Sequence, residues 1–381
     1  MTAPATESVL TDDLLERIRS RAAASDRDNT FFDEDLAELR AAGYLRPRSL
    51  LATARDQRRL AAAAPATALG INMHLVVVGI ARVLHDRGDV SLDWILADAE
   101  AGELFAFGNS EAGNDLVMWD SLTAVESVDG GFAFTGTKIF TSLAPAWTRL
   151  AVFGKQQDGP DGPRLVHGVI ARDTPGSAVP GLATIEDWDT LGMRATQSHT
   201  TRLDGVVVPD GRITRMLPVG PNADPYVFGL FANFLLLIGS VYAGIADRAL
   251  ELAVEAAHRR TSLKNGGAAY AQDPDIRWRV ADAALALDAL RPEIEGLAAD
   301  VDALGDHGAD WFRFLTGAKH RATETARTVV DHAARVAGGG GYRSASELSR
   351  LQRDVLAGVF HPSDTESVHA TVAANLLGPL G

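Results

Sequence analysis

Apolar residues recur at helical spacing through the first part of the chain. Between residues 10 and 24, Leu14, Leu15 and Ile18 stand among acidic residues and arginines, which is typical of an amphipathic helix that packs on one side. The same pattern predicts helices over 31–42, 51–64 and 92–101. Residues 66–84 are apolar on nearly every side and predict a central, buried helix. We therefore expect an N-terminal α-helical domain, residues 1–103.

The spacing of apolar residues changes from helical to alternating at about residue 104. Residues 121–128 and 132–135 flank Asp129-Gly130-Gly131, which is typical of a β-hairpin turn. Further strands are predicted over 150–153, 165–170 and 200–208. The pattern therefore predicts a middle β domain, a barrel or sandwich, over residues 104–217.

Helical spacing returns after Pro221 and continues to the end of the chain. The predicted helices cover residues 235–261, 276–304, 311–337 and 346–356. We expect Pro292 to kink or divide the second of these helices. The apolar run 227–241 is interrupted by Asn233 and is shorter than a bilayer requires, so it predicts a core helix. The fold class is therefore mainly α with a central β domain, ending in a C-terminal helical bundle of four helices, residues 218–381.

Charge and composition narrow the range of functions. The 36 basic and 50 acidic residues leave a net charge of −14, which argues against a nucleic-acid-binding face and against binding to an anionic membrane. The chain contains no cysteine, which excludes disulfides and thiolate chemistry and is compatible with a reducing cytoplasm. The acidic opening MTAPATESVLTDDLLERI predicts no signal peptide. The histidines show no metal-ligand spacing, so we predict no metal site.

Two features near the C-terminus are candidates for chemistry. Four glycines, residues 338–341, follow a predicted helix, where one glycine is enough to end it. Such a cluster also lets backbone N–H groups approach a polyanionic cofactor closely. Further on, Phe360-His361-Pro362 presents an imidazole at a stiff turn. The simpler interpretations are a helix stop and an ordinary loop histidine.

Three motifs resemble those of the acyl-CoA dehydrogenase superfamily, and together they extend over nearly the whole chain. One is residues 187–198 (DWDTLGMRATQS) followed by residues 203–209 (LDGVVVP), similar to a GMR segment and a D-x-V-x-V-P strand. Another is residues 136–142 (GTKIFTS), similar to a GxKxWIT strand. The third is residues 338–342 (GGGGY) with Arg353-Asp354, which looks like GGxGY…RD.

The resemblance implies a flavin, FAD, held between the β domain and the C-terminal bundle of a homotetramer or homodimer. It places Phe107 and Ser110 at the edge of the isoalloxazine, with Asn114 where the superfamily has a pyrophosphate-binding serine. It also places Phe140 over the ring, in the position of a tryptophan, and the Ser142 hydroxyl near N5. The pyrophosphate and adenine end is assigned to Arg259 as first candidate, Arg260 as second, and Gly338 with Gly339.

The chain departs from the superfamily at the catalytic base. An acyl-CoA dehydrogenase removes an α-proton with a glutamate that usually lies eight residues after the RD aspartate, where this chain has Pro362, preceded by His361. The second known location of the base falls near Asn233-Phe234. Neither position supplies a carboxylate, and Asp364 remains as a substitute candidate.

Flavin monooxygenases of the same superfamily, such as dibenzothiophene monooxygenase and the amino-sugar nitrososynthases, use reduced flavin and O₂. The chain is similar to the dibenzothiophene type at four positions, which we take as candidate catalytic residues: His361, Ser142, Asn109 and His74. We therefore favour a monooxygenase acting on a small organic substrate, with FAD or with reduced FMN or FADH₂ supplied by a flavin reductase. The alternatives are an acyl-CoA dehydrogenase that uses FAD and a catalytically silent flavin-binding homologue. The simpler interpretations are a buried core role for His74 and local backbone hydrogen bonds for Asn109 and Ser142.

Overall fold

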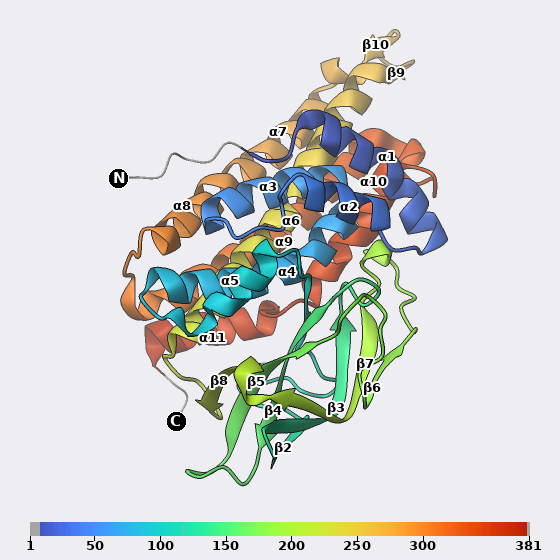
Figure 1. Ribbon diagram of the computed structural model, residues 1–381. Helices are drawn as coiled ribbons and strands as arrows, with labels where there is room; N and C mark the ends of the chain where they lie inside the picture. The colour runs from blue at the N-terminus through green and yellow to red at the C-terminus, as the bar shows by residue number, and fades with distance from the viewer. Residues whose placement is uncertain (1–7, 117, 379–381) are drawn as a thin grey trace.

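The structure is a computed structural model that describes residues 8–116 and 118–378. Helices from the two ends of the chain pack together, and a β domain lies against one side of them (Figure 1). The chain passes from helix to strand between Glu100 and Phe105, and back to helix between Pro218 and Pro225. The helical parts, although far apart in sequence, therefore form one body.

The N-terminal helices follow the predicted pattern closely. They are α1 (Asp12–Asp28), α2 (Asp33–Ala41), α3 (Leu50–Ala63), α4 (Pro65–Asp86) and α5 (Asp93–Glu100). The Thr11 hydroxyl caps α1 by accepting from the Leu14 N–H, and α1 ends at Asn29, which has a left-handed φ of 52°. Helix α4 is buried along most of its length, as its uninterrupted apolar pattern predicts.

The β domain is built on one eight-stranded sheet. Its strands are β1 (Phe105–Gly108), β2 (Ala124–Val128), β3 (Gly131–Thr141), β4 (Arg149–Gln156), β5 (Arg164–Ala171), β6 (Leu182–Ile185), β7 (His199–Pro209) and β8 (Ile213–Pro218). The order is β6-β7-β3-β2-β4-β5-β8, with β1 pairing in parallel with β4. Strands β1, β6 and β8 were not predicted, because they are short and show little alternation.

The C-terminal helices are α6 (Pro225–Arg259), α7 (Pro274–Asp288), α8 (Leu290–Asp302), α9 (Trp311–Ala337), α10 (Glu347–Asp354) and α11 (Thr365–Leu377). The predicted helix over 276–304 is divided at Ala289, and Pro292 lies in the first turn of α8, which confirms the expected break. The small hairpin β9 (Thr261–Ser262) and β10 (Ala268–Ala269), which follows α6, was not predicted. Helix α11 was also not predicted.

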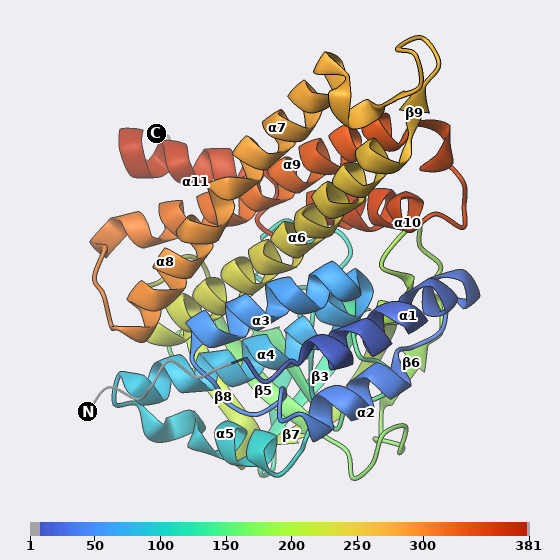
Figure 2. The same ribbon diagram turned by 90° about the horizontal axis from the view of Figure 1, so that it is seen from above.

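Helix α6 is the centre of the helical body. It lies between α3 and α4 on one side and α9 on the other (Figure 2). Helices α4 and α6 are long and apolar enough to span a membrane by length and composition, but 89% and 83% of their most apolar windows are buried inside the protein. Their apolar surface is therefore used in packing the core, as expected for the run 227–241.

Candidate active site

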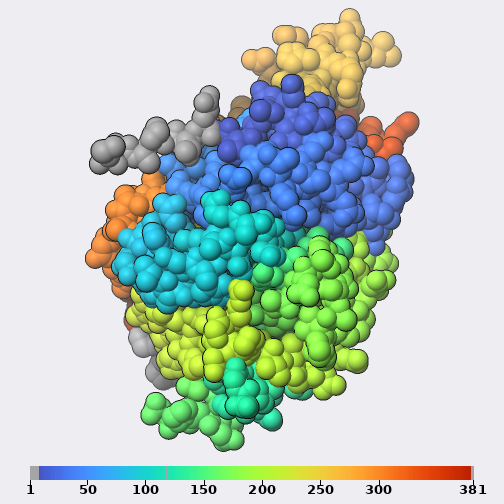
Figure 3. Space-filling model, in the orientation of Figure 1, coloured from blue at the N-terminus to red at the C-terminus, as the bar shows by residue number. Residues whose placement is uncertain are grey.

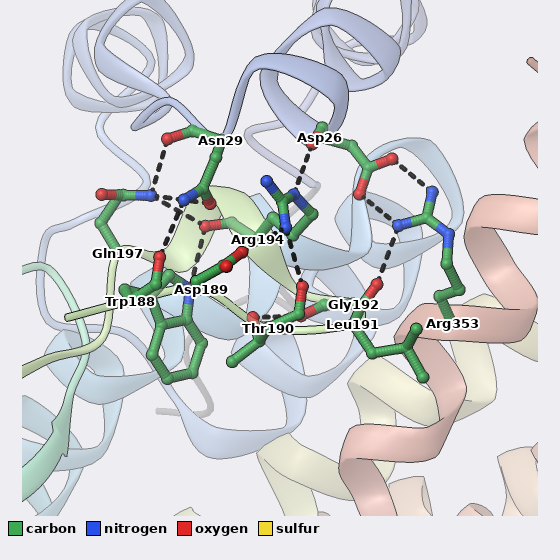
Figure 4. Close-up of polar contacts among 10 residues, drawn as sticks. All are labelled: Asp26, Asn29, Trp188, Asp189, Thr190, Leu191, Gly192, Arg194, Gln197 and Arg353. Carbon is green, nitrogen blue, oxygen red and sulfur yellow. Dashed lines mark hydrogen bonds and ion pairs between the residues drawn. The ribbon is translucent and has the colours of Figure 1, made fainter. Parts of the chain in front are cut away.

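The loop of residues 187–197, called here the signature loop, joins all three parts of the chain (Figure 4). Arg194 donates to the Asp26 carbonyl at the end of α1, at 2.8 Å, and to the Thr190 carbonyl within the loop, at 2.9 Å. From α10, Arg353 donates to the Leu191 carbonyl at 2.9 Å and forms an ion pair with the Asp26 carboxylate. The loop is therefore held between the first helix and the C-terminal bundle.

Further contacts of the signature loop explain why it contains Gly192 and why Asp354 of α10 is buried against it. A Cβ on Gly192 would lie 2.4 Å from the Arg353 carbonyl carbon, so only glycine allows this approach. The next N–H, of Met193, donates to Asp354 Oδ1 at 2.6 Å. Burial raises the pKa of Asp354 to about 6, against the lowering effect of this hydrogen bond and of nearby Arg350.

A chain of hydroxyl groups leads from the signature loop to β3. Thr196 hydrogen-bonds to Ser198 at 2.8 Å, and Ser198 to Ser142 at 2.8 Å. Just before Ser142, Phe140 has a φ of 58° and is 54% exposed, with its ring 6.0 Å from Trp188 in an edge-on arrangement. An exposed aromatic ring and a buried serine therefore lie at the end of β3, beside the signature loop.

Strand β1 and the loop after it hold the residues predicted to lie at the flavin edge. Phe107 and Asn109 are buried, and the Ser110 carbonyl accepts from the Ile139 N–H at 2.9 Å, which ties this segment to β3. Asn109 donates to Met118 Sδ, and its Oδ1 is buried without a partner among the described residues. Asn114 instead bonds within its own loop, to Glu111, the Asp120 carbonyl and the Leu116 N–H.

Glu111 organises this loop, a role that the sequence patterns did not identify. It is paired with the buried Lys138 at 2.7 Å and also accepts from Thr123 and Ser121. Burial alone raises the pKa of Glu111, but the Lys138 ammonium and these hydrogen bonds outweigh it and lower the pKa to about 2. Glu111 is therefore an ionised structural carboxylate that supports the loop.

His361 lies in a turn that follows the short helix Val355–Val359. Its ring is 5.9 Å from the ring of Tyr242 on α6, and its Nε2 is buried with no partner among the described residues. Burial and the nearby Lys319 ammonium lower the pKa of His361 to about 3. The imidazole is therefore neutral at physiological pH, with one ring nitrogen available to exchange a proton.

His74 is placed very differently. The Phe105 N–H donates to its Nδ1 at 3.1 Å, and its Nε2 donates to the Leu45 carbonyl at 2.7 Å. Burial lowers the pKa of His74 to about 4. Both ring nitrogens are therefore used to join α4 to β1 and to the α2–α3 connection, and neither is free to take part in chemistry.

The substitute candidate Asp364 and the position near Asn233 both have structural roles. Asp364 caps α11 by accepting from the Ser367 N–H at 2.8 Å, and hydrogen bonds with the side chain and the backbone of Ser367 lower the pKa of its carboxyl group. Asn233 donates to the Gly229 carbonyl one turn earlier in α6 and packs against Gly79 of α4. The substitute candidate Asp364 is therefore an ionised helix cap.

Arg260, the second arginine candidate for the pyrophosphate, lies beside the glycine cluster. Arg260 donates to the Val336 carbonyl, and its guanidinium lies 4.3 Å from the centre of the Tyr270 ring. A Cβ on Gly338 would lie 2.8 Å from this guanidinium, whereas Gly339 has open space around it. Arg259, the first candidate, is exposed at the end of α6. Arg260 therefore lies at the glycine cluster, whereas Arg259 is exposed to solvent.

The predicted flavin residues offer a fit for the cofactor. A flavin ring needs an aromatic or apolar face and polar groups at its edge, and the exposed ring of Phe140, the hydroxyl of Ser142 and the unpartnered Oδ1 of Asn109 are groups of these kinds. The open backbone of Gly339 and the guanidinium of Arg260 suit a pyrophosphate. Among the described residues, no group of three or more His, Asp or Glu side chains is placed to hold a metal ion.

Comparison with known proteins shows which family the chain belongs to. Residues 236–363 match the profile described as acyl-CoA dehydrogenase, C-terminal domain. The fold matches the structure of KijD3 in complex with FMN and dTDP-3-amino-2,3,6-trideoxy-4-keto-3-methyl-D-glucose, with a TM-score of 0.85, 26% identity, and coverage of 100% of this chain and 96% of that chain. The chain belongs to the acyl-CoA dehydrogenase superfamily. The predicted superfamily and fold class are confirmed.

Two relatives in sequence represent the two chemistries of the superfamily. L-evernosamine nitrososynthase from Micromonospora sp. is 33% identical over 61% of this chain, and the aligned region spans 53% of that protein, about half its length. The putative acyl-CoA dehydrogenase YdbM from Bacillus subtilis is 27% identical over 95% of this chain and 94% of its own length. The prediction of a flavin-dependent oxidoreductase is confirmed as a class, with FMN and FAD both allowed as the flavin.

Proposed function

We propose that the protein is a monooxygenase that uses reduced flavin and O₂ to oxidise a small organic substrate. The observation that carries the proposal is His361, a neutral imidazole with a buried Nε2, at the turn where dehydrogenases of this superfamily place their glutamate. Dehydrogenation of an acyl thioester requires a carboxylate base, and the nearest candidates are a helix cap and a helix-bonded asparagine. An imidazole suits a reaction in which protons move to and from oxygen.

The side chains at the predicted flavin edge have complementary roles in this proposal. Bound reduced flavin supplies the electrons that activate O₂. His361 holds or moves a proton at Nε2, while the Ser142 hydroxyl and the Asn109 amide orient the reacting groups. The buried position of Ser142 and Asn109 excludes water from that side, which protects a reactive intermediate from hydrolysis.

The test is turnover of His361→Ala with chemically reduced FMN or FAD and O₂, measured on a panel of aminosugar nucleotides and heteroaromatic compounds. General acid–base catalysis contributes at least about 100-fold, so the variant should lose at least that factor in kcat. His369→Ala is the control, because that histidine is exposed on α11. Unchanged turnover in His361→Ala would remove the imidazole from the mechanism.

A second measurement decides between the two chemistries. Oxidised holoenzyme is mixed anaerobically with acyl-CoA thioesters of several chain lengths, and flavin absorbance is followed. We expect the flavin to stay oxidised. Bleaching of the flavin would support the dehydrogenase alternative, and inactivity in both assays would support a silent flavin-binding homologue.

The proposal includes a homo-oligomer and a separate flavin reductase. Large apolar side chains are exposed on the C-terminal bundle and its hairpin: Leu263, Trp278, Leu285, Tyr342 and Phe360. A second copy of the chain that covers them would bring this surface out of water. A reductase fits the use of flavin in its reduced form, and an acidic chain without cysteine suits a cytoplasmic location.

A further inference from the structure

Lys319 is a buried lysine that none of the sequence patterns singled out. It lies on α9 and is 2% exposed. Its Nζ donates to the carbonyl oxygens of Gly358 at 3.1 Å, His361 at 2.8 Å and Ser363 at 2.8 Å. An ammonium group has three donors, and all three are used on one turn of the chain.

The surroundings of Lys319 are unusual for a buried cation. Among the described residues it forms no ion pair, and the nearest acidic side chains that act on it are Asp364 and Glu324. Burial lowers the pKa of Lys319 to about 8. Burying an ammonium without a carboxylate is unfavourable unless its hydrogen bonds are all satisfied, and here backbone carbonyls alone satisfy them.

The turn that Lys319 binds is also fixed from the side of α6. A Cβ on Gly358 would lie 2.8 Å from the Tyr242 ring and 2.6 Å from Thr323 of α9. The turn is therefore packed between α6 and α9, and the Lys319 ammonium binds its carbonyl groups. Two of the three carbonyls belong to His361 and Ser363, on either side of Pro362. These contacts therefore fix the position of the His361 backbone.

We propose that Lys319 is a positioning residue for His361: by binding three carbonyls of the 358–363 turn, it holds the imidazole against Tyr242 with Nε2 unpartnered. The inference rests on the proposed function of His361 and deepens it. Lys319 acts through the backbone and has no donor left for a substrate or a flavin.

The groups that act on the His361 imidazole come from each element packed against its turn. They are Lys319 on α9 and the Tyr242 phenol on α6, with Asp364 at the start of α11 acting on the Lys319 ammonium and Asp354 at the end of α10 acting on Tyr242. Tyr242 is neutral, because burial raises its pKa well above its usual value. Of these groups, only the Lys319 ammonium directly disfavours the imidazolium form of His361.

The direct test is the titration of His361 by NMR of the full-length protein with labelled histidine. In the wild type His361 should stay neutral down to about pH 4, since its pKa is about 3. In Lys319→Met the charge and the anchor are both lost, so the pKa of His361 should rise. Lys264→Met, on an exposed loop, is the matched control and should leave His361 unchanged. An unchanged His361 titration in folded Lys319→Met would overturn the inference.

A second variant moves the turn and leaves the charge in place. Gly358→Ala puts a methyl group into the Tyr242 ring, so the turn must shift away while Lys319 stays intact. We expect kcat to fall on the order of 100-fold, as for other small misplacements of a catalytic group, with little change in flavin Kd. Wild-type kcat in Gly358→Ala would contradict the inference even if Lys319→Met does not fold.

These measurements separate the inference from the proposed function. If His361→Ala keeps full turnover, the catalytic role of the imidazole fails, whereas the NMR titration of Lys319→Met still decides whether Lys319 acts on the imidazole. If His361→Ala is inactive and both Lys319→Met and Gly358→Ala keep wild-type kcat, the function stands and the positioning role is wrong.

Discussion

At the scale of single residues, two histidines with lowered pKa values differ in whether their ring nitrogens have partners. Burial lowers the pKa values of both His74 and His361, so both are neutral at physiological pH. His74 uses both ring nitrogens on backbone groups, whereas Nε2 of His361 has no partner among the described residues. A free nitrogen, more than the shift in pKa, is what makes a buried histidine available for proton transfer.

Asp354 carries a prediction about stability and pH. Its pKa is about 6 in the folded protein and about 3.9 in an unfolded chain, so its protonated form stabilises the fold below pH 4, and that stabilisation is lost as the pH rises through 6. Asp354→Asn keeps an oxygen for the Met193 N–H and cannot ionise. Between pH 4 and pH 7 the free energy of unfolding of this variant should therefore gain about 2 kcal/mol relative to the wild type.

Urea unfolding at several pH values measures this difference. Asp161→Asn, on an exposed loop, is the control and should follow the wild type at every pH. A constant difference between Asp354→Asn and the wild type across this range would show that Asp354 is already ionised in the folded protein at low pH.

At the scale of elements, the signature loop connects the β domain to helices from both ends of the chain. It has no regular secondary structure except the short helix Arg194–Thr196, and its position depends on side chains from α1 and α10. The same loop leads through Thr196 and Ser198 to Ser142. We therefore expect a change at the junction of α1 and α10 to affect the predicted flavin edge through these hydrogen bonds.

Arg353→Ala tests this junction. The variant leaves the Asp26 carboxylate and the Leu191 carbonyl without their donor, and loss of such partly buried, charged hydrogen bonds costs about 2 kcal/mol. We expect a lower midpoint in thermal unfolding and weaker flavin binding by fluorescence titration. Arg343→Ala, at an exposed position, is the matched control. Loss of stability with unchanged flavin Kd would show that the loop does not transmit the change.

At the scale of the whole molecule, the apolar residues that remain exposed suggest where copies of the chain meet. The hairpin after α6 and the adjoining end of α7 project beyond the body (Figure 3), and Leu263 in this hairpin is 96% exposed. Burying such a residue is worth roughly 1.5–3 kcal/mol. A projecting apolar hairpin therefore fits an interface better than a free surface.

Leu263→Asp tests the oligomer. If the hairpin lies in an interface, an unpaired carboxylate there should dissociate the assembly, and light scattering after size-exclusion chromatography should record a lower mass than for the wild type. Val128→Asp, on an exposed strand of the β domain, is the control and should keep the wild-type mass. A wild-type mass for Leu263→Asp would place the interface elsewhere.

The sequence by itself determined the order of helices, β domain and helices, the buried helices α4 and α6, and the break near Pro292. These features depend on local periodicity and on the missing N–H of proline, which are properties of neighbouring residues. It also identified the motifs that carry the family, and His361 among them. Short strands such as β1 and β6 were not predicted, because few residues carry their alternation.

Only the tertiary structure decided what each polar group is free to do. In the folded chain both ring nitrogens of His74 are hydrogen-bonded, and Asp364 caps a helix. Arg260 lies against Gly338, and Lys319 binds the turn that carries His361. Each of these outcomes depends on groups far apart in sequence, such as Lys319 and His361, which are 42 positions apart. Spacing along a chain describes one element at a time, whereas hydrogen-bond satisfaction and burial are set by which elements pack together.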